Sequence, residues 1–235
     1  MVGRTSYLDL LKQRLDEARG GHGQTLLLAG EAGIGKSRLV AEAKAWAHQN
    51  GLAIFQGNCF EPDRVLPYAP ILDLLRDFIA SHSAEALKPY TPELVKLIPE
   101  LGVILPNITP SPSLEPAQEK QRYFQTLNEW ISFAGGPTGS LVIVEDIHWC
   151  DDTSLEFLLY FAHRISSSPI LLLLTYRNDE LNPSLRHFLA DLDHARLASE
   201  LTLNRLLQVD VETMIAAILN SPLPLRQSLP KPFTH

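Results

Sequence analysis

The sequence predicts an α/β fold in which a five-stranded parallel sheet carries helices on both faces. Short, almost purely apolar runs, such as 141–144 and 170–174, alternate with longer helical patterns. Such runs indicate the strands of a parallel sheet that is covered on both sides. A glycine-rich turn at 30–37 joins the first of these strands to a helix. In such folds, ligands bind at the carboxyl ends of the strands.

Caps, apolar periodicity and glycines define the expected elements of the amino-terminal part. They are a helix that Thr5 or Ser6 caps and that runs to about residue 19, a strand at 25–29, a helix from 36 to about 50, and a strand at 52–56. A helical insertion is expected next, at about 65–133. Its pieces are helices at 71–80, 84–87 and 92–98, a proline-rich loop at 106–116 and a helix at 117–133.

After the insertion, strands and helices alternate again. The expected elements are a strand at 141–145, a helix at 153–165, a strand at 170–175, a helix at 183–192, a short fifth strand at 201–203 and a helix at 209–219. Residues 220–235 contain four prolines and no apolar periodicity. That pattern predicts a disordered tail or linker.

The run from Gly30 to Ser37 matches the pattern G-x-x-x-x-G-K-[ST] of a phosphate-binding P-loop. A helix N-terminus offers unpaired N–H groups and the positive end of a dipole, and glycines let the backbone bend around phosphates. Lys36 is expected to reach the β- and γ-phosphates, and Ser37 Oγ to hold Mg²⁺. The residues expected to bind ATP or ADP here are Gly30, Gly33, Ile34, Gly35, Lys36, Ser37 and Arg38. The alternative is a strand–helix turn with a surface lysine.

Two acids follow the third predicted strand, as in a Walker B motif. Glu145 and Asp146 come directly after four apolar residues. At a strand's carboxyl end, one acid can hold Mg²⁺ and the other can polarise the attacking water. The register assigns the metal to Glu145 and the water to Asp146, but the order reverses the usual Asp-Glu, which leaves the assignment open and predicts weak hydrolysis. The alternative is a strand that ends in surface acids.

Two further segments complete the predicted nucleotide site. Thr175 and Arg177 end the fourth strand, where an arginine can fork onto phosphate oxygens. The alternative for Arg177 is a cap of the strand end or an ion pair with Asp179 or Glu180. The segment Val2, Gly3 and Arg4 precedes the first helix and can wrap the base through backbone contacts. The alternative for it is an ordinary turn.

Other prominent residues are expected to have structural roles. We expect His148 and Trp149 to pack rather than to ligate, and Asp151 or Asp152 to cap a helix. Arg186 or Arg196 could act on the ATP of a neighbouring subunit, although surface or ion-pair roles are favoured. Cys59 and Cys150 have no metal-ligand spacing and are expected to be free thiols.

Composition narrows the class of protein. The chain has 235 residues, of which 45% are hydrophobic and 20% charged, and a formal net charge of −7. Basic residues are scattered, so direct nucleic-acid binding is not expected. No apolar run approaches the roughly 18 residues of a membrane span, and the first residues lack the apolar region of a signal peptide. These observations predict a soluble cytoplasmic protein with no membrane partner.

Taken together, these signals resemble the AAA-type module of STAND-class signalling ATPases, of the origin-recognition-like AAA subtype. The matching pieces are Val2-Gly3-Arg4, the P-loop at 30–37, Gln56-Gly-Asn-Cys59 with Leu66-Pro-Tyr-Ala-Pro70, Val144-Glu-Asp-Ile-His-Trp-Cys-Asp151, and Thr175-Tyr-Arg177. The resemblance implies a P-loop NTPase fold and a domain that spans 1–205. It also implies that 206–219 is the start of a lid of which most is missing.

The resemblance also implies a role in regulation. In that family the module belongs to large bacterial regulators, including LuxR-type transcriptional regulators and cyclases, and ATP versus ADP sets an on/off switch. We therefore expect an ATP-binding, weakly hydrolysing switch module, whose effector and sensor domains or chains lie outside this sequence and which can form a nucleotide-dependent oligomer. The alternatives are a stand-alone oligomeric AAA-type ATPase or nucleic-acid-associated loader, a P-loop kinase for a small molecule, and a non-hydrolysing scaffold.

Overall fold

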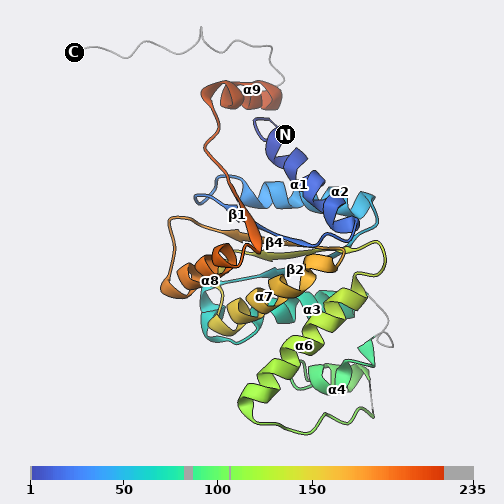
Figure 1. Ribbon diagram of the computed structural model, residues 1–235. Helices are drawn as coiled ribbons and strands as arrows, with labels where there is room; N and C mark the ends of the chain where they lie inside the picture. Colours follow the sequence, from blue (N-terminus) through green and yellow to red (C-terminus); the bar gives the residue numbers. More distant parts are fainter. Residues whose placement is uncertain (1, 82–86, 106, 220–235) are drawn as a thin grey trace, which may run out of the picture.

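The computed structural model describes residues 2–81, 87–105 and 107–219. Within these residues, the sheet has five parallel strands in the order β2-β3-β4-β1-β5, which confirms the predicted architecture (Figure 1). The strands are β1 (Gln24–Ala29), β2 (Ala53–Asn58), β3 (Ser140–Glu145), β4 (Ile170–Tyr176) and β5 (Ala198–Thr202). β1 therefore lies between β4 and β5, and the turn that follows it opens at the carboxyl edge of the sheet.

Helices cover both faces of the sheet. In Figure 1, α1 (Thr5–Arg19) and α2 (Lys36–Gln49) lie above the strands, and other helices lie below them. These include α3 (Ala69–Ser81), α6 (Pro116–Ala134), α7 (Asp152–Arg164) and α8 (Pro183–His194). Along β1, Leu26 and Leu28 enter the core beneath α1 and α2, while Leu27 enters the core on the other face. Strands buried on both sides explain why the sequence shows apolar runs instead of alternation.

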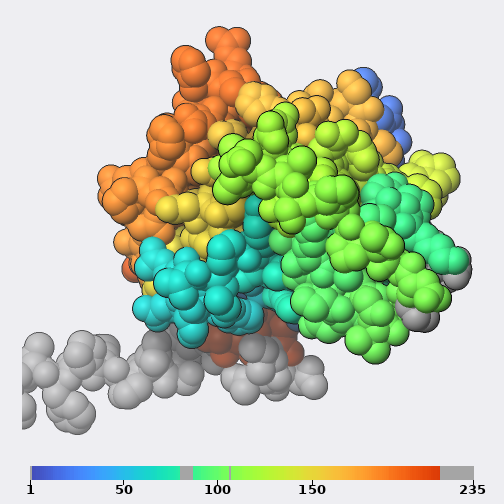
Figure 2. Space-filling view, turned by 90° about the horizontal axis from the view of Figure 1, so that it is seen from below, coloured from blue at the N-terminus to red at the C-terminus, as the bar shows by residue number. Residues whose placement is uncertain are grey.

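The helical insertion packs on β2 through aromatic side chains. The ring of Trp130 on α6 lies edge-on to Phe55 of β2 and to Phe78 of α3, with centroids 5.6 and 5.1 Å apart. The insertion also contains the 3₁₀ helix η1 (Glu61–Val65) and the short helices α4 (Thr91–Leu94) and α5 (Leu101–Ile104). Viewed from its own side, the insertion, coloured cyan to green, makes up much of the surface (Figure 2).

The connections after β3 and β4 carry the functional segments. A 3₁₀ helix, η3 (Ile147–Trp149), separates β3 from α7, and another, η4 (Ile165–Ser167), follows α7. α9 (Gln208–Leu219) extends beyond α1 at the end of the described chain (Figure 1). No helix among the described residues is long and apolar enough to cross a membrane.

Several predicted boundaries were wrong, each for a local reason. The fifth strand is Ala198–Thr202 instead of 201–203, because an edge strand with half-exposed polar residues has no apolar run. α1 has Arg4 instead of Thr5 or Ser6 at its N-cap, and the Arg4 side chain makes no capping hydrogen bond. The four-residue helix α5 was not predicted. Residues 84–86 of the expected piece at 84–87, Pro106 and the expected tail at 220–235 lie outside the described residues.

Candidate nucleotide-binding site

A cavity of about 210 Å³ opens at the carboxyl ends of β1, β3 and β4. It is lined by Ala32, Gly33, Gly35, Lys36, Ser37, Arg38, Asp146 and Arg177. The structure thus brings together the predicted P-loop, one of the two predicted acids and the predicted arginine, from three different connections.

The P-loop has the conformation of an open phosphate cradle. Gly33 and Gly35 have φ angles of +71° and +108°, and a Cβ at either position would meet no atom within 4 Å. Glycine adopts this left-handed backbone at little cost. α2 begins after Gly35 without any side-chain cap. Its first N–H groups are therefore left for a ligand, and a phosphate fits that position.

Lys36 is buried and directed into the loop. Its Nζ donates to the carbonyl oxygens of Gly30 at 2.8 Å and Glu31 at 3.1 Å, and the residue is 7% exposed. Burial lowers the pKa of Lys36, and the nearby Asp146 carboxylate opposes this effect. A phosphate would supply the anionic partner that these neutral carbonyls do not. The cradle and this lysine therefore fit a nucleoside triphosphate.

The two acids at the end of β3 have different surroundings. Asp146 has φ 59° and ψ 44°, and its N–H donates to Thr175 Oγ1 at 3.0 Å. Glu145 accepts from Gln56 Nε2 at 2.8 Å, and Gln56 Oε1 in turn accepts from Lys44 Nζ. Asp146 lines the cavity and Glu145 does not. Which of the two acids holds Mg²⁺, an assignment that the sequence left open, stays a prediction.

Arg177 lines the cavity while it is paired with an acid of its own loop. Its Nη1 donates to Glu180 Oε1 at 2.5 Å, and this hydrogen bond raises the pKa of Arg177. Pairing with Glu180 was the structural alternative to a phosphate contact. Nη1 is thus occupied in this conformation, and phosphate oxygens would compete with Glu180 for this donor.

The segment before α1 reaches the P-loop. Arg4 is 6% exposed, and its Nη2 donates to the Ile34 carbonyl at 3.1 Å. Gly3 has φ +64°, and a Cβ there would lie 2.7 Å from Asp210 Cγ. Gly3 and Arg4 therefore lie between the P-loop and the start of α9. Arg4 thus makes a structural contact with the P-loop, and its contact with the nucleotide base stays a prediction.

Asp151 and His148, for which structural roles were expected, lie between β3 and α7. Asp151 caps α7 by accepting from Ser154 N at 2.9 Å. His148 is buried, and burial lowers its pKa while Asp146 and Glu180 raise it.

The two arginines considered for a neighbouring subunit lie at different places. Arg186 lies in the first turn of α8 and donates to Leu181 O. Arg196 lines a cavity at the amino end of β1, opposite the nucleotide site.

The two cysteines, distant in sequence, lie together in the fold. Cys59 follows β2, Cys150 follows η3, and each is 4% exposed. A hydrogen bond with the Cys59 thiol and burial raise the pKa of Cys150 well above its ordinary value. Both are free thiols, as predicted. Among the described residues, no cluster of three His, Cys, Asp or Glu could hold a metal.

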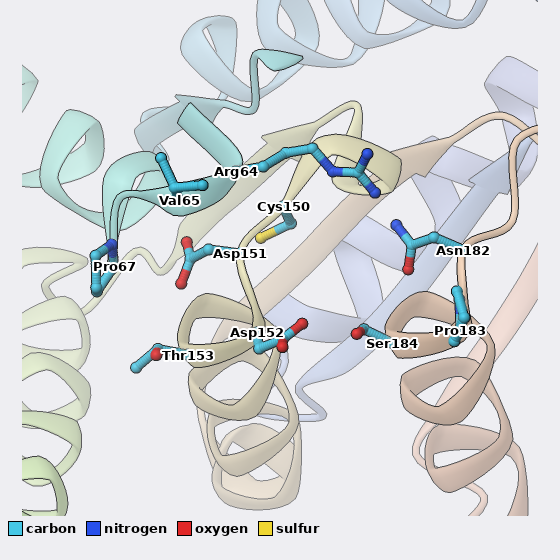
Figure 3. Close-up of a pocket in the computed structure, with 10 residues that line it drawn as sticks. All are labelled: Arg64, Val65, Pro67, Cys150, Asp151, Asp152, Thr153, Asn182, Pro183 and Ser184. Atoms are coloured by element: carbon cyan, nitrogen blue, oxygen red, sulfur yellow. The ribbon is translucent and has the colours of Figure 1, made fainter. Parts of the chain in front are cut away.

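A second cavity of about 360 Å³ lies between the N-termini of α7 and α8 and shares no lining residue with the nucleotide cavity. Figure 3 shows Arg64 extending from η1 toward Asn182, the residue before α8, with Asp151 and Asp152 on the α7 side. The Arg64 guanidinium also lies over the Trp149 ring, 5.2 Å from its centroid.

Sequence reasoning did not assign a role to Gln56, Lys44 or Glu180 in the nucleotide site. Gln56 belongs to a segment that carries the family resemblance, but its partner Glu145 is 89 residues away. Glu180 was considered only as a partner of Arg177. Its second carboxylate oxygen lies 3.6 Å from His148 Nε2, which no sequence pattern indicates.

Most of this chain matches a known protein family. The AAA ATPase domain family matches residues 1–174. An uncharacterized protein of Rhizobium meliloti (strain 1021) is 28% identical over 192 residues, which are 75% of this chain and 18% of that protein. The chain thus spans less than a fifth of the length of this relative.

Two solved structures are similar at low identity. AMPPCP-bound DnaA from Aquifex aeolicus is 12% identical, with a TM-score of 0.47 over 95% of this chain and 54% of that one. A STAND protein with a tetratricopeptide repeat sensor from Pyrococcus horikoshii is 18% identical, with a TM-score of 0.42 over 92% of this chain and 26% of that one. On the family match, which covers most of its length, this chain belongs to the AAA ATPase domain family.

Proposed function

We propose that this chain is the ATP-binding switch module of a larger signalling or transcription regulator, and that it hydrolyses ATP slowly. The observation that carries this proposal is the cavity in which an open P-loop, Lys36, Asp146 and Arg177 converge. A triphosphate needs an anion cradle, a metal-side acid and a cation that reaches the last phosphate, and these residues supply one of each.

The proposed roles follow from where each side chain lies. Lys36 exchanges its carbonyl partners for the β- and γ-phosphates. Ser37 and Asp146 hold Mg²⁺, which neutralises phosphate charge when it is bound. Arg177 binds γ-phosphate oxygens. Glu145, which Gln56 holds outside the cavity, orients the attacking water only after it turns. That requirement supports slow turnover.

The proposed module has the boundaries that the sequence suggested. We take 1–205 as the nucleotide domain and 206–219 as the opening of a lid. Two contacts support a lid that starts beside the P-loop: Leu203 N donates to Ala29 O at 2.8 Å, and Arg205 pairs with Glu31 at 2.7 Å. A lid that begins there is placed to respond to the nucleotide.

Binding of a fluorescent ATP analogue with Mg²⁺ tests the proposal. Lys36→Ala removes a charge-assisted phosphate contact and is expected to weaken binding by on the order of 1.5–3 kcal/mol, or roughly 10- to 100-fold. Lys120→Ala is the matched control, because Lys120, on α6 of the helical insertion, forms an exposed ion pair with Glu156 of α7. Equal affinities of wild type and Lys36→Ala would contradict the proposal.

A further inference from the structure

His148 has an unusual environment for a residue that only packs. The imidazole is 2% exposed, and neither ring nitrogen has a hydrogen-bond partner. A neutral imidazole has one N–H donor and one acceptor nitrogen, and buried polar groups are normally paired. His148 Nε2 and Nδ1 are therefore available to groups that approach them when the site rearranges.

Two carboxylates from different loops face this ring. Nδ1 lies 3.8 Å from Asp146 Oδ1, and Nε2 lies 3.6 Å from Glu180 Oε2. Both distances are a few tenths of an ångström beyond a hydrogen bond. The backbone of His148 is held, because Asn182 Nδ2 donates to its carbonyl at 2.9 Å. A small movement of Glu180 is thus enough to join it to the ring.

Glu180 is occupied on its other side. Oε1 accepts from Arg177 Nη1 at 2.5 Å, and Arg177 lines the nucleotide cavity with Lys36 and Asp146. An arginine that forks onto phosphate oxygens must weaken such an ion pair. Glu180 would then be left half-buried with its main partner gone, which costs free energy unless another donor takes its place.

We propose that His148 is the positioning residue that receives Glu180 when Arg177 turns to the γ-phosphate. Without nucleotide, Glu180 holds Arg177. With ATP, Arg177 binds phosphate and Glu180 accepts a hydrogen bond from His148 Nε2–H. With ADP, no γ-phosphate attracts Arg177, and the Arg177–Glu180 pair persists. The exchange transfers no proton and breaks no covalent bond.

This inference deepens the proposed function and rests on it, and it predicts a specific effect on nucleotide preference. His148 acts only through Arg177, so losing it weakens ATP binding and leaves ADP binding unchanged. A residue that merely packs would, when replaced, weaken both to the same extent. The ratio of the two dissociation constants therefore separates a positioning role from a structural one.

The test measures dissociation constants of fluorescent ATP and ADP analogues with Mg²⁺. His148→Leu is expected to lose about tenfold in preference for ATP, the loss of one hydrogen bond to a charged group. His148→Gln, whose amide N–H extends to about the place of Nε2, restores the preference. His148→Asn, whose amide extends to about the place of Nδ1, does not. His187→Asn, on the exposed face of α8, is the matched control.

A double-mutant cycle gives a second measurement that does not depend on His148→Leu being well folded. Glu180→Gln weakens the restraint on Arg177 and raises ATP affinity, and in that background His148→Gln and His148→Asn bind ATP equally well. The inference is overturned if His148→Leu and His148→Asn keep the wild-type ATP/ADP ratio or lose ATP and ADP binding equally. If wild type binds neither nucleotide, the proposed function fails first and this inference with it.

Discussion

The Gln56 side chain donates from Nε2 to Glu145 Oε1 at 2.8 Å, across the neighbouring strands β2 and β3. Glu145 does not line the nucleotide cavity, and Lys44 of α2 donates to Gln56 from the other side. Glu145, the acid that the strand register assigns to the metal, is thus hydrogen-bonded to Gln56. We expect this hydrogen bond to slow hydrolysis.

Removing this restraint is expected to speed hydrolysis. Gln56→Leu keeps a side chain of similar size but takes away the amide that holds Glu145, so the carboxylate can turn toward the γ-phosphate. We expect phosphate release to rise several-fold while the affinity for ATP stays within about twofold. Gln125→Leu, which removes only an exposed contact with Glu129, is the control. A rate that stays at the wild-type level or falls would contradict this role of Gln56.

The two acids should respond differently to removal of charge. Asp146 shares the cavity with Lys36 and Ser37, whereas Glu145 does not line it. Asp146→Asn is therefore expected to reduce the gain in ATP affinity that Mg²⁺ provides by about tenfold, and Glu145→Gln to leave that gain nearly unchanged. Titrations of nucleotide with Mg²⁺ and with a chelator measure the difference. A larger loss in Glu145→Gln than in Asp146→Asn would indicate that Glu145 is the acid that holds Mg²⁺.

The sequence was sufficient for the parts of this protein that local patterns encode. Apolar runs located four of the strands to within one or two residues, and the P-loop pattern located the cradle. The fifth strand was predicted at the wrong residues, because an edge strand with polar residues such as Glu200 has no apolar run. Contacts between segments that are distant in the sequence, such as those of Gln56 with Glu145 and of His148 with Glu180, produce no periodic pattern in the sequence. Only the folded sheet brings them together.

Buried tyrosines should make the protein unstable in alkali. Burial raises the pKa of Tyr68 to about 12, with a smaller effect of Tyr123, whose own pKa burial and Glu119 also raise to about 12. In the unfolded chain these phenols ionise near pH 10. The folded state therefore binds protons more tightly, and its stability is complete below pH 10 and falls as the pH rises toward 12.

Tyr68→Phe is expected to flatten this decline by on the order of 2 kcal/mol between pH 10 and 12. Denaturant unfolding at several alkaline pH values gives the free energies, and phenolate absorbance follows ionisation. Tyr7→Phe, near the amino terminus, is the comparison. Parallel stability curves for Tyr68→Phe and wild type would show that Tyr68 ionises as it does in the unfolded chain.

The thiol pair should be unreactive in the folded protein. Cys59 and Cys150 are each 4% exposed, and the raised pKa of Cys150 reduces the thiolate that reacts. A thiol-specific reagent at mildly alkaline pH is expected to modify both only after denaturant is added. Ser113→Cys, in an exposed loop, should react at once and serves as the control. Rapid labelling of wild type would mean that the segment around η3 opens readily.

Gly57 allows β2 to approach α3 closely. A Cβ at Gly57 would lie 2.1 Å from the carbonyl oxygen of Pro70, which is backbone and cannot rotate away. Gly57→Ala must push β2 and α3 apart, at a cost of about 1–3 kcal/mol, and each kcal/mol lowers the midpoint of thermal unfolding by roughly 2–4 °C. In Gly102→Ala, the new methyl would make an ordinary contact of 3.5 Å with Val95. That variant, within α5, is expected to be as stable as wild type or up to about 1 kcal/mol more stable. If the two alanine variants unfold at the same temperature, the close approach at Pro70 is not what requires glycine at position 57.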